Sequence, residues 1–490
     1  MPSCRVDWRQ EGLRASGFES MTSTTIRTVL FLVGLSILGA VAGLQLVRSV
    51  PYATFFYVVG LVLMFSVLQP LVGLVVYLAT AYVKLLWLIP GFTNFPLNLV
   101  IGATTFASML IREAISERRM TVVKSGPDLL LIWFLLATVV SPLAQGRMGA
   151  ALSDGYGFLN CVILYLLITN LVNSVRRLDI VLRTLALLTI WVAVEAIVQS
   201  YWGSGIGGVT PYVDSEGSRA KVLGFSGDPN YLAGGLLLPI PFLFLELSGS
   251  SSIGKRMVAA VATLLICFAI FQTGSRGGAL TLAVIGTLLL IKVAGLRKGV
   301  VLSVLVVAAI YLLGPSRFKN LNPTEPSSFG RILAWEESFE EFAASPLFGI
   351  GSGRAGHVRG VAPHSGFMQA AADLGLFGLI PWVLFILVTM KNALFVSRRA
   401  AGDGLARLCL LSEGALFGCL AWVITLVLVG SPYLSSLYLM AGLCVAAANI
   451  FVQMTGSRYV LVEMKDYAYA MLVIAGGFGA YGFMVYVVKA

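Results

Sequence analysis

Long apolar stretches alternate with short polar ones along almost the whole chain. About fifteen apolar runs of roughly 20 residues can be drawn between breaks made of charged residues, proline or glycine. A helix of that length crosses about 30 Å of hydrocarbon, because it rises 1.5 Å per residue. The runs on either side of Pro70 lie so close together that they could form one broken helix. The pattern therefore predicts an all-α polytopic membrane protein with about 12–15 transmembrane helices. The runs are 27–47, 52–69, 71–89, 97–115, 128–145, 156–173, 178–200, 229–248, 257–273, 278–296, 299–313, 366–390, 408–430, 433–453 and 467–488.

The composition agrees with a membrane location. Only 12% of the 490 residues are charged, whereas a soluble chain averages about 25%. The six cysteines show no CxxC spacing, which argues against a disulfide framework or a zinc site and favours their use as small apolar side chains. No basic block interleaved with aromatic residues is found, so nucleic acid is not expected as a partner.

The net charge of +11 comes largely from Lys and Arg that cluster at alternate ends of the apolar runs. Cytoplasmic loops of membrane proteins collect these residues. One topology, with the N-terminus in the cytoplasm, places all six clusters on the inner side. The clusters are Arg112/Arg118/Arg119/Lys124, Arg176/Arg177, Lys255/Arg256, Arg297/Lys298, Arg398/Arg399/Arg407 and Arg458/Lys465.

This topology divides the chain into four parts. They are a cytoplasmic N-terminal tail (1–26), a transmembrane bundle (27–313), a periplasmic loop (314–365) and C-terminal transmembrane helices (366–490). We expect no cleaved signal peptide, because no short apolar region with a cleavage site precedes the first run. The pattern leaves open whether Met1 or Met21 is the start.

The same topology places several Lys and Arg residues on the outer face, where positive charge is disfavoured. Arg276 is the most informative, because it lies in the turn 274–278 (Gly-Ser-Arg-Gly-Gly) between two apolar runs. The glycines would let a ligand approach the backbone, a helix starting near Gly278 would present its positive end, and a guanidinium can donate two hydrogen bonds to phosphate. This favours phosphate binding over an arginine that only snorkels to the membrane surface. The outer set is Arg147, Arg219, Lys221, Arg276, Arg317, Lys319, Arg331, Arg354 and Arg359.

Arg219 precedes a second polar motif, 224–231 (Gly-Phe-Ser-Gly-Asp-Pro-Asn-Tyr). Asp228 or Asn230 can cap the helix that follows, with Pro229 in its first turn. Two interpretations stay open for these side chains: capping alone, or support of a ligand site. Arg219 itself could be a solvated loop residue or a second ligand for phosphate.

The predicted outer loop contains an amphipathic helix that opens at Gly330-Arg331 and ends before Pro346. Such a helix could lie on the membrane surface or cap a cavity. The glycines of 349–356 then predict a flexible turn that contains Arg354 and is a weak nucleotide signature. The apolar face of the helix holds Ile332, Trp335, Phe339 and Phe342, and the opposite face holds Glu336, Glu337, Glu340 and Glu341.

His357 and His364 are the two histidines of the chain, and His364 lies where the chain re-enters the membrane. A neutral imidazole can take a proton from a hydroxyl, and nearby arginines would keep it neutral. The predicted outer face shows no DxD pair, HExxH motif or serine nucleophile elbow, and the chain has no Walker A motif. We therefore expect no metal or other cofactor, and a transfer at this face would draw its energy from an activated lipid-linked donor.

Four motifs follow one another between 219 and 378. They are Arg219 with 224–230, the turn 274–278, Gly330-Arg331 with Trp335 running to 346–351, and 364–369 continuing to 373–378. In this order they resemble the O-antigen ligase and polymerase superfamily of bacterial membrane glycosyltransferases. The resemblance implies a GT-C-like bundle in the bacterial inner membrane, with its active site facing the periplasm.

The resemblance also implies the partners and the roles of the site residues. The donor would be a glycan on undecaprenyl diphosphate, and the acceptor hydroxyl would belong to a glycan or to lipid A-core. A single displacement without metal would invert the anomeric centre. The implied site consists of His364 as the catalytic residue, Arg219, Arg276, Arg331 and Arg354 as diphosphate ligands, and Asp228, Asn230 and Trp335 in support.

Several alternatives stay open. A ligase would attach the glycan to lipid A-core, whereas a polymerase would join repeat units of O-antigen or exopolysaccharide, and related enzymes glycosylate proteins. Ser365 stands where the family often has Asn, which leaves the acceptor undetermined. A transporter or flippase for an anionic lipid-linked substrate would use intramembrane carboxylates such as Glu195 and Glu413. A non-catalytic subunit that binds other polysaccharide assembly proteins is the third class.

Overall fold

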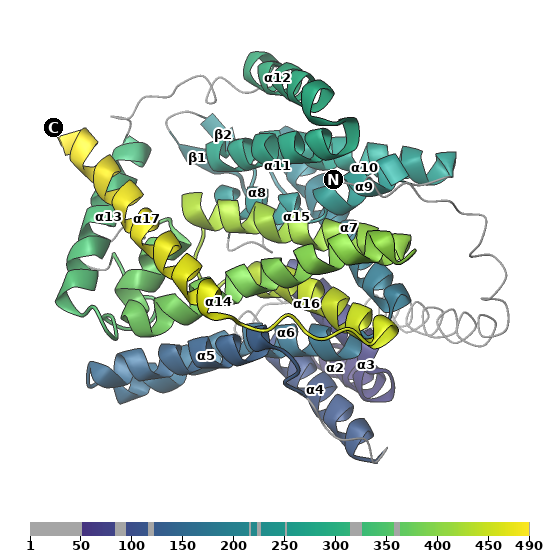
Figure 1. The fold of residues 1–490 in the computed structure, drawn as a ribbon, viewed down its shortest axis with the longest axis horizontal. Helices are drawn as coiled ribbons and strands as arrows, with labels where there is room; N and C mark the ends of the chain where they lie inside the picture. The colour runs from purple at the N-terminus through teal and green to yellow at the C-terminus, as the bar shows by residue number, and fades with distance from the viewer. Residues whose placement is uncertain are drawn as a thin grey trace.

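The computed structural model describes residues 51–83, 95–115, 122–214, 217–222, 227–249, 252–313, 326–356 and 363–489. The predicted tail 1–26, the first apolar run 27–47 and His357 lie outside these residues. Helices dominate the described part, and the only sheet in it is a two-stranded hairpin (Figure 1). The all-α prediction is confirmed. The elements are α2 (Pro51–Leu68), α3 (Pro70–Val83), α4 (Leu97–Ile115), α5 (Gly126–Ala144), α6 (Met148–Leu171), α7 (Val175–Trp202), η3 (Ile206–Gly208), β1 (Tyr212–Asp214), β2 (Gly217–Arg219), α8 (Pro229–Leu237), α9 (Ile240–Gly249), α10 (Ile253–Gln272), α11 (Arg276–Ala294), α12 (Leu296–Leu313), α13 (Pro326–Ala344), α14 (Gly366–Gly402), α15 (Ala406–Leu428), α16 (Ser435–Thr455) and α17 (Met464–Lys489).

Ten helical segments of the described chain are long and apolar enough to cross a membrane. The two apolar runs on either side of Pro70 form separate helices, α2 and α3, with a break at Gln69, so proline starts a new helix there. The predicted run 229–248 is also divided, between α8 and α9, just before Pro241. The architecture is therefore that of a multi-pass membrane protein.

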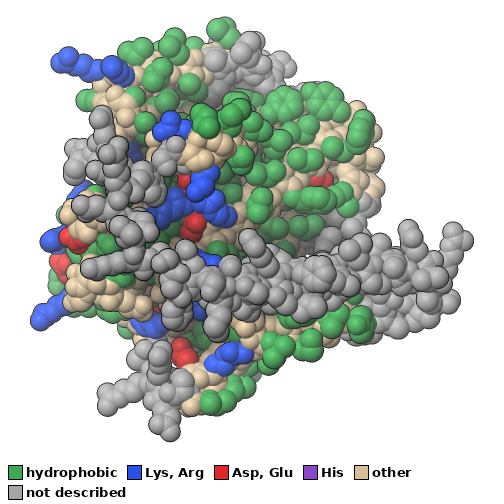
Figure 2. Space-filling model, turned by 90° about the vertical axis from the view of Figure 1, so that its right-hand side faces the viewer, with side chains coloured by type: hydrophobic (Ala, Val, Ile, Leu, Met, Phe, Trp, Pro, Cys, Tyr) green, Lys and Arg blue, Asp and Glu red, His purple; other side chains and the backbone are tan. Residues whose placement is uncertain are grey.

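The long helices run roughly side by side, so the connections between them fall at two ends of the bundle (Figure 1). The hairpin, the turn before α11, α13 and the start of α14 lie at one end. The connections that hold the predicted inner clusters of Lys and Arg lie at the other, and these side chains are conspicuous when the bundle is viewed from that end (Figure 2). The structure thus separates the two sets of connections as predicted, while the compartment that each end faces stays a prediction.

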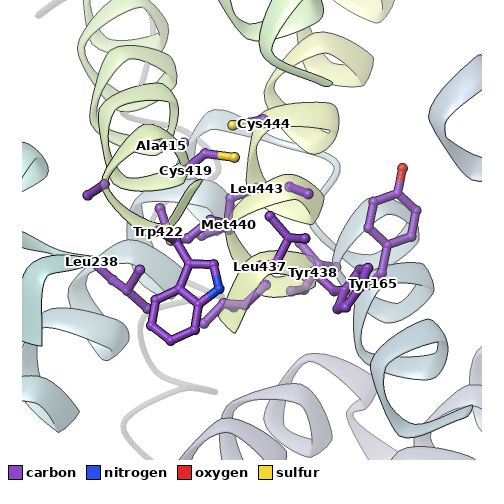
Figure 3. Packing of buried hydrophobic residues seen from close by; sticks show 14 of the residues in the cluster. Tyr165, Leu238, Ala415, Cys419, Trp422, Leu437, Tyr438, Met440, Leu443 and Cys444 are labelled. Atoms are coloured by element: carbon purple, nitrogen blue, oxygen red, sulfur yellow. The ribbon is translucent and has the colours of Figure 1, made fainter. Parts of the chain in front are cut away.

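The core is built around α14, α15 and α16, which pack closely on one another, and α8 packs on α15. Figure 3 shows the apolar layer between α15 and α16, with Leu238 and the α6 residue Tyr165 beside it. Glycines allow this approach: a Cβ on Gly234 would lie 2.7–2.8 Å from atoms of Thr425 and Trp422. Small residues at helix interfaces are the usual means of bringing membrane helices together. Cys419 and Cys444 are buried free thiols in the same layer, in line with their predicted use as apolar filling.

The amphipathic helix predicted in the outer loop is α13, and its apolar face packs as expected. Phe339 and Phe342 lie against Phe478 of α17, with ring centroids 5.6 and 4.8 Å apart. The opposite, acidic face is not uniformly exposed, because Glu337 is only 3% exposed. Both faces of the helix have neighbours, since α13 lies against α14 as well as α17 (Figure 1).

Candidate active site at the α13 end of the bundle

Arg219 ends the β hairpin and connects three segments. Its Nε donates to the carbonyl of Thr273 at 2.9 Å, and its Nη2 donates to the Oδ1 of Asn230 at 2.8 Å. A third nitrogen lies 3.8 Å from the carboxylate of Asp214, and the guanidinium stands 5.8 Å from the ring centroid of Tyr212. Arg219 is 8% exposed, so it is neither a solvated loop residue nor freely available to a ligand. Its contacts favour a positioning role.

The two polar residues of the next motif have different tasks. The Asp228 carboxylate accepts from the backbone N–H groups of Asn230 and Tyr231, at 2.6 and 3.3 Å, and so caps α8. The Asn230 side chain is instead the acceptor for Arg219. Capping alone therefore accounts for part of this motif, and the remainder joins the hairpin to the start of α8.

The turn between α10 and α11 presents Arg276. Gly274 has a φ of 57°, which turns the chain, and the Ser275 hydroxyl accepts from the N–H of Gly278 at 3.1 Å. The helix begins at Arg276, two residues before the predicted start. A Cβ on Gly278 would lie 2.6 Å from the Cβ of Ala233, so the start of α11 is pressed against α8. The half-buried guanidinium thus belongs to the first turn of a helix that packs against α8.

His364 is held in an unusual backbone conformation just before α14. Its φ is 50°, and it is the one non-glycine residue with a positive φ among those that the structure describes. The preceding carbonyl, of Pro363, accepts from Trp335 Nε1 at 2.9 Å. The following residue, Ser365, caps α14, and its hydroxyl lies 2.7 Å from that of Tyr481. Helices α13 and α17 therefore fix the position of the histidine from both sides.

The imidazole of His364 is partly buried, and its Nδ1 has no hydrogen-bond partner within the described chain. Burial lowers the pKa of His364 below its ordinary value of 6.5, and the positive charge of Arg331 lowers it further, whereas Asp228 opposes both. The side chain is accordingly neutral at pH 7 and can accept a proton. The charges that act on His364 are those of Arg331 in α13 and of Asp228, which caps α8.

A second cluster surrounds Asp373, which the sequence had shown only as part of a motif. Its carboxylate accepts four hydrogen bonds, all of 2.7–2.9 Å, from the backbone N–H groups of Gly353, Arg354 and Ala355 and from the hydroxyl of Tyr433. The Asp373 carboxylate therefore holds the backbone of the turn at 353–355 against α14. An acidic residue within an apolar stretch was the signal in the sequence that could have revealed this role, because a buried carboxylate needs hydrogen-bond partners. In the structure Asp373 has no exposed surface.

The same turn fills a break in α14. Gly375 has φ 59° and ψ −162°, which interrupts the helix. The freed backbone groups pair with the turn: Leu376 N donates to the carbonyl of Pro346 at 2.8 Å, and Gly351 N donates to the carbonyl of Asp373 at 3.0 Å. A Cβ on Gly349 would lie 2.3 Å from the Asp373 backbone, so only glycine fits this crossing.

Arg354 belongs to this second cluster. The charge of its guanidinium acts on Asp154 of α6, and its Cδ lies 3.3 Å from where a Cβ on Gly351 would be. Glu341 of α13 accepts from the N–H of Gly356 at 3.2 Å, and burial raises its pKa to about 7. Of the predicted site residues, the structure gathers His364, Arg331, Trp335, Asp228, Asn230, Arg219 and Arg276 around the starts of α8, α11 and α14, and places Arg354 apart from them.

The Glu413 carboxylate, considered for a transport pathway, lies 2.7 Å from the Lys292 ammonium near the opposite end of the bundle. Such a pair is accounted for by the packing of α11 on α15. The described part of the chain holds no group of three or more His, Cys, Asp or Glu side chains that could bind a metal ion.

Comparison with known families identifies one match. Residues 261–383 match the Wzy_C family model, whose description is O-antigen ligase. The segment runs from α10 into α14 and includes Arg276, Arg331, His364 and Asp373. No curated protein was found to match the chain. The match covers residues 261–383 of the 490-residue chain and supports the predicted resemblance to the O-antigen ligase and polymerase superfamily.

Proposed function

We propose that the protein is an inverting glycosyltransferase that moves a glycan from undecaprenyl diphosphate to an acceptor hydroxyl at the periplasmic face of the bacterial inner membrane. The observation that carries the proposal is the environment of His364: a neutral imidazole with an unpartnered Nδ1, held between two helices beside the cationic Arg331. The family match supports a glycan-transferring enzyme in general.

In the proposed reaction the acceptor hydroxyl gives its proton to His364 as its oxygen attacks the anomeric carbon of the donor sugar. The bond between that carbon and the diphosphate oxygen breaks, and undecaprenyl diphosphate leaves with the electron pair. One displacement inverts the anomeric centre. The proton balance closes when the imidazolium releases the proton to solvent.

The cationic residues would stabilise the leaving group. Arg276, at the positive end of α11, and Arg331, beside His364, would bind the diphosphate oxygens. Arg219 would act as a positioning residue, because its donors already join the hairpin to the turn before α11. No step in this scheme calls for a metal ion, and metal independence is part of the proposal.

The decisive experiment incubates purified protein with undecaprenyl diphosphate-linked glycan and candidate acceptors and identifies the product by mass spectrometry. Arg276→Ala and His364→Ala should each abolish transfer while the protein still inserts and folds. Lys298→Ala, which removes a charge at the opposite end of the bundle, is the control and should transfer normally. Wild-type transfer by either site variant would refute the assignment, and the product itself separates a ligase from a polymerase.

A further inference from the structure

An open groove lies at the end of the bundle that carries the basic connections, opposite the candidate active site. Its volume is about 640 Å³, within the range of about 300–1,000 Å³ usual for small-molecule sites. One wall is the last third of α14, and the other is the connection between α16 and α17. The lining residues are Lys391, Leu394, Phe395, Arg398, Arg399, Arg458, Tyr459, Val460, Leu461 and Glu463.

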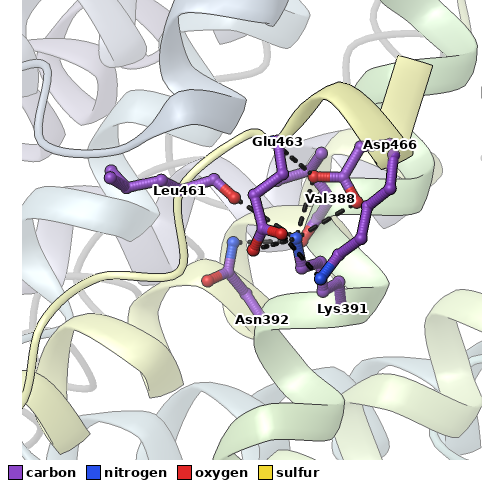
Figure 4. Close-up of polar contacts among 7 residues, drawn as sticks. Val388, Lys391, Asn392, Leu461, Glu463 and Asp466 are labelled. Atoms are coloured by element: carbon purple, nitrogen blue, oxygen red, sulfur yellow. Dashed lines mark hydrogen bonds and ion pairs between the residues drawn. The ribbon is translucent and has the colours of Figure 1, made fainter. Parts of the chain in front are cut away.

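The wall formed by the connection is fastened to α14 at one point (Figure 4). The ammonium of Lys391 lies 2.8 Å from the carboxylate of Asp466 and 3.2 Å from that of Glu463, and it also donates to the carbonyl of Leu461 at 3.3 Å. Lys391 is therefore electrically balanced, and its task is to hold the groove in shape.

The three arginines that line the groove are not balanced in this way. Within the described residues, no carboxylate lies at ion-pair distance from Arg398, Arg399 or Arg458. The guanidinium of Arg399 stands 5.9 Å from the ring centroid of Phe395, which fixes it over the apolar floor. The groove thus combines three unpaired positive charges with a wall of aliphatic and aromatic side chains.

The groove also lies at a height suited to lipid headgroups. From the break at Gly375 to Gly402, α14 is about 40 Å long, whereas the hydrocarbon of a bilayer is about 30 Å thick. Counted from that break, about 30 Å of helix ends near Leu394, so the turns with Arg398 and Arg399 lie beyond a hydrocarbon layer that begins at the break. A soluble anion would use only the arginines, but a lipid would use both the arginines and the apolar wall.

We propose that this groove binds an anionic phospholipid of the adjacent leaflet, with its phosphate between Arg398, Arg399 and Arg458 and an acyl chain along Leu394 and Phe395. Basic pockets between helices at a membrane interface bind such headgroups through charge and hydrogen bonds. The proposal is independent of the transfer reaction, because none of these residues belongs to the candidate active site.

Native mass spectrometry of the purified full chain, titrated with cardiolipin or with phosphatidylcholine, tests the proposal. Wild type should retain cardiolipin at concentrations at which phosphatidylcholine is lost. The triple variant Arg398→Gln/Arg399→Gln/Arg458→Gln should bind cardiolipin about 100-fold more weakly, since each juxtamembrane arginine contributes about fivefold. Equal retention of both lipids by wild type, or wild-type retention by the triple variant, would overturn the proposal.

Matched controls distinguish lipid binding in the groove from general attraction of lipid to positive charge at this end of the bundle. Lys255→Gln/Arg297→Gln/Lys298→Gln also removes three charges at the same end but should leave cardiolipin binding unchanged. If the groove triple does not fold, the single variant Arg458→Gln, in a connection between helices, should still weaken binding by about fivefold. Displacement of cardiolipin by inorganic pyrophosphate at equal concentration would identify a soluble anion as the occupant and overturn the assignment to lipid.

Discussion

Replacing Asp373 by Asn tests whether the turn at the break of α14 depends on one buried carboxylate. In the wild type, Oδ1 accepts from the N–H groups of Arg354 and Ala355, and Oδ2 accepts from Gly353 N–H and the Tyr433 hydroxyl. An amide of the same shape keeps one oxygen acceptor and puts an NH₂ group in place of the other.

The less costly orientation of the amide keeps its oxygen toward the N–H groups of Arg354 and Ala355. The Tyr433 hydroxyl can then rotate and accept from the new NH₂ group, but the N–H of Gly353 cannot, and it loses its acceptor. One buried unsatisfied N–H costs about 1–3 kcal/mol. The remaining hydrogen bonds also weaken by about 1 kcal/mol each, because the acceptor is no longer charged. The loss is partly offset because a neutral amide is less costly to bury than a carboxylate. We therefore expect the free energy of unfolding to fall by about 2–4 kcal/mol in total.

Thermal unfolding of the purified protein, followed by tryptophan fluorescence, measures this loss. Asp373→Asn should lower the apparent Tm by about 5 °C. Asp403→Asn is the matched control, because Asp403 is exposed just after α14, and this variant should unfold with the wild type. An Asp373→Asn protein that unfolds within 1 °C of the control would refute the reasoning that the carboxylate holds the turn.

Three further predictions concern the candidate site. His364 must be neutral to accept a proton, and its pKa lies below 6.5, so transfer should fall only as the pH drops through that lowered pKa. Arg331→Gln removes one cause of the lowered pKa and should therefore move the acid limb of the pH–rate profile to higher pH. Gly349→Ala should lower the free energy of unfolding by more than about 3 kcal/mol, since its Cβ would lie 2.3 Å from the backbone of α14. Gly353→Ala, at a similar φ but in open space, should lower it by only about 1 kcal/mol in the same thermal unfolding assay. Trp335→Phe keeps an aromatic side chain but removes the hydrogen bond to the carbonyl just before the histidine. The transfer rate should therefore fall about 10-fold with a stability loss of only about 1 kcal/mol, and an unchanged rate would show that this contact does not position the histidine.

The arginines of the candidate site have different contacts, which the motifs did not reveal. The arginines were predicted as one set of diphosphate ligands, yet they differ in their surroundings. Arg219 is buried with protein acceptors, Arg331 acts on His364, and Arg354 lies with Asp154 in a second cluster. Spacing along the chain cannot separate these cases, because the partners of each guanidinium come from other helices.

The sequence by itself determined the membrane architecture, the separation of basic connections to one end, and α13 with its aromatic face. Hydropathy and helical periodicity are local properties, so a window of about 20 residues is enough to read them. It also indicated the candidate site residues, because arginine and histidine are costly at the outer boundary of apolar runs unless they have a use.

Only the tertiary structure decided how these residues are used. The carboxylate of Asp373 finds its partners in the turn 353–355 and in Tyr433, and the burial of Glu337 follows from the packing of α13 on the bundle. The pKa of His364 is lowered first by its burial and then by the charge of Arg331. Each of these contacts joins segments far apart in sequence. Hydrogen bonding, burial and charge act through space, and a pattern along the chain does not contain those distances.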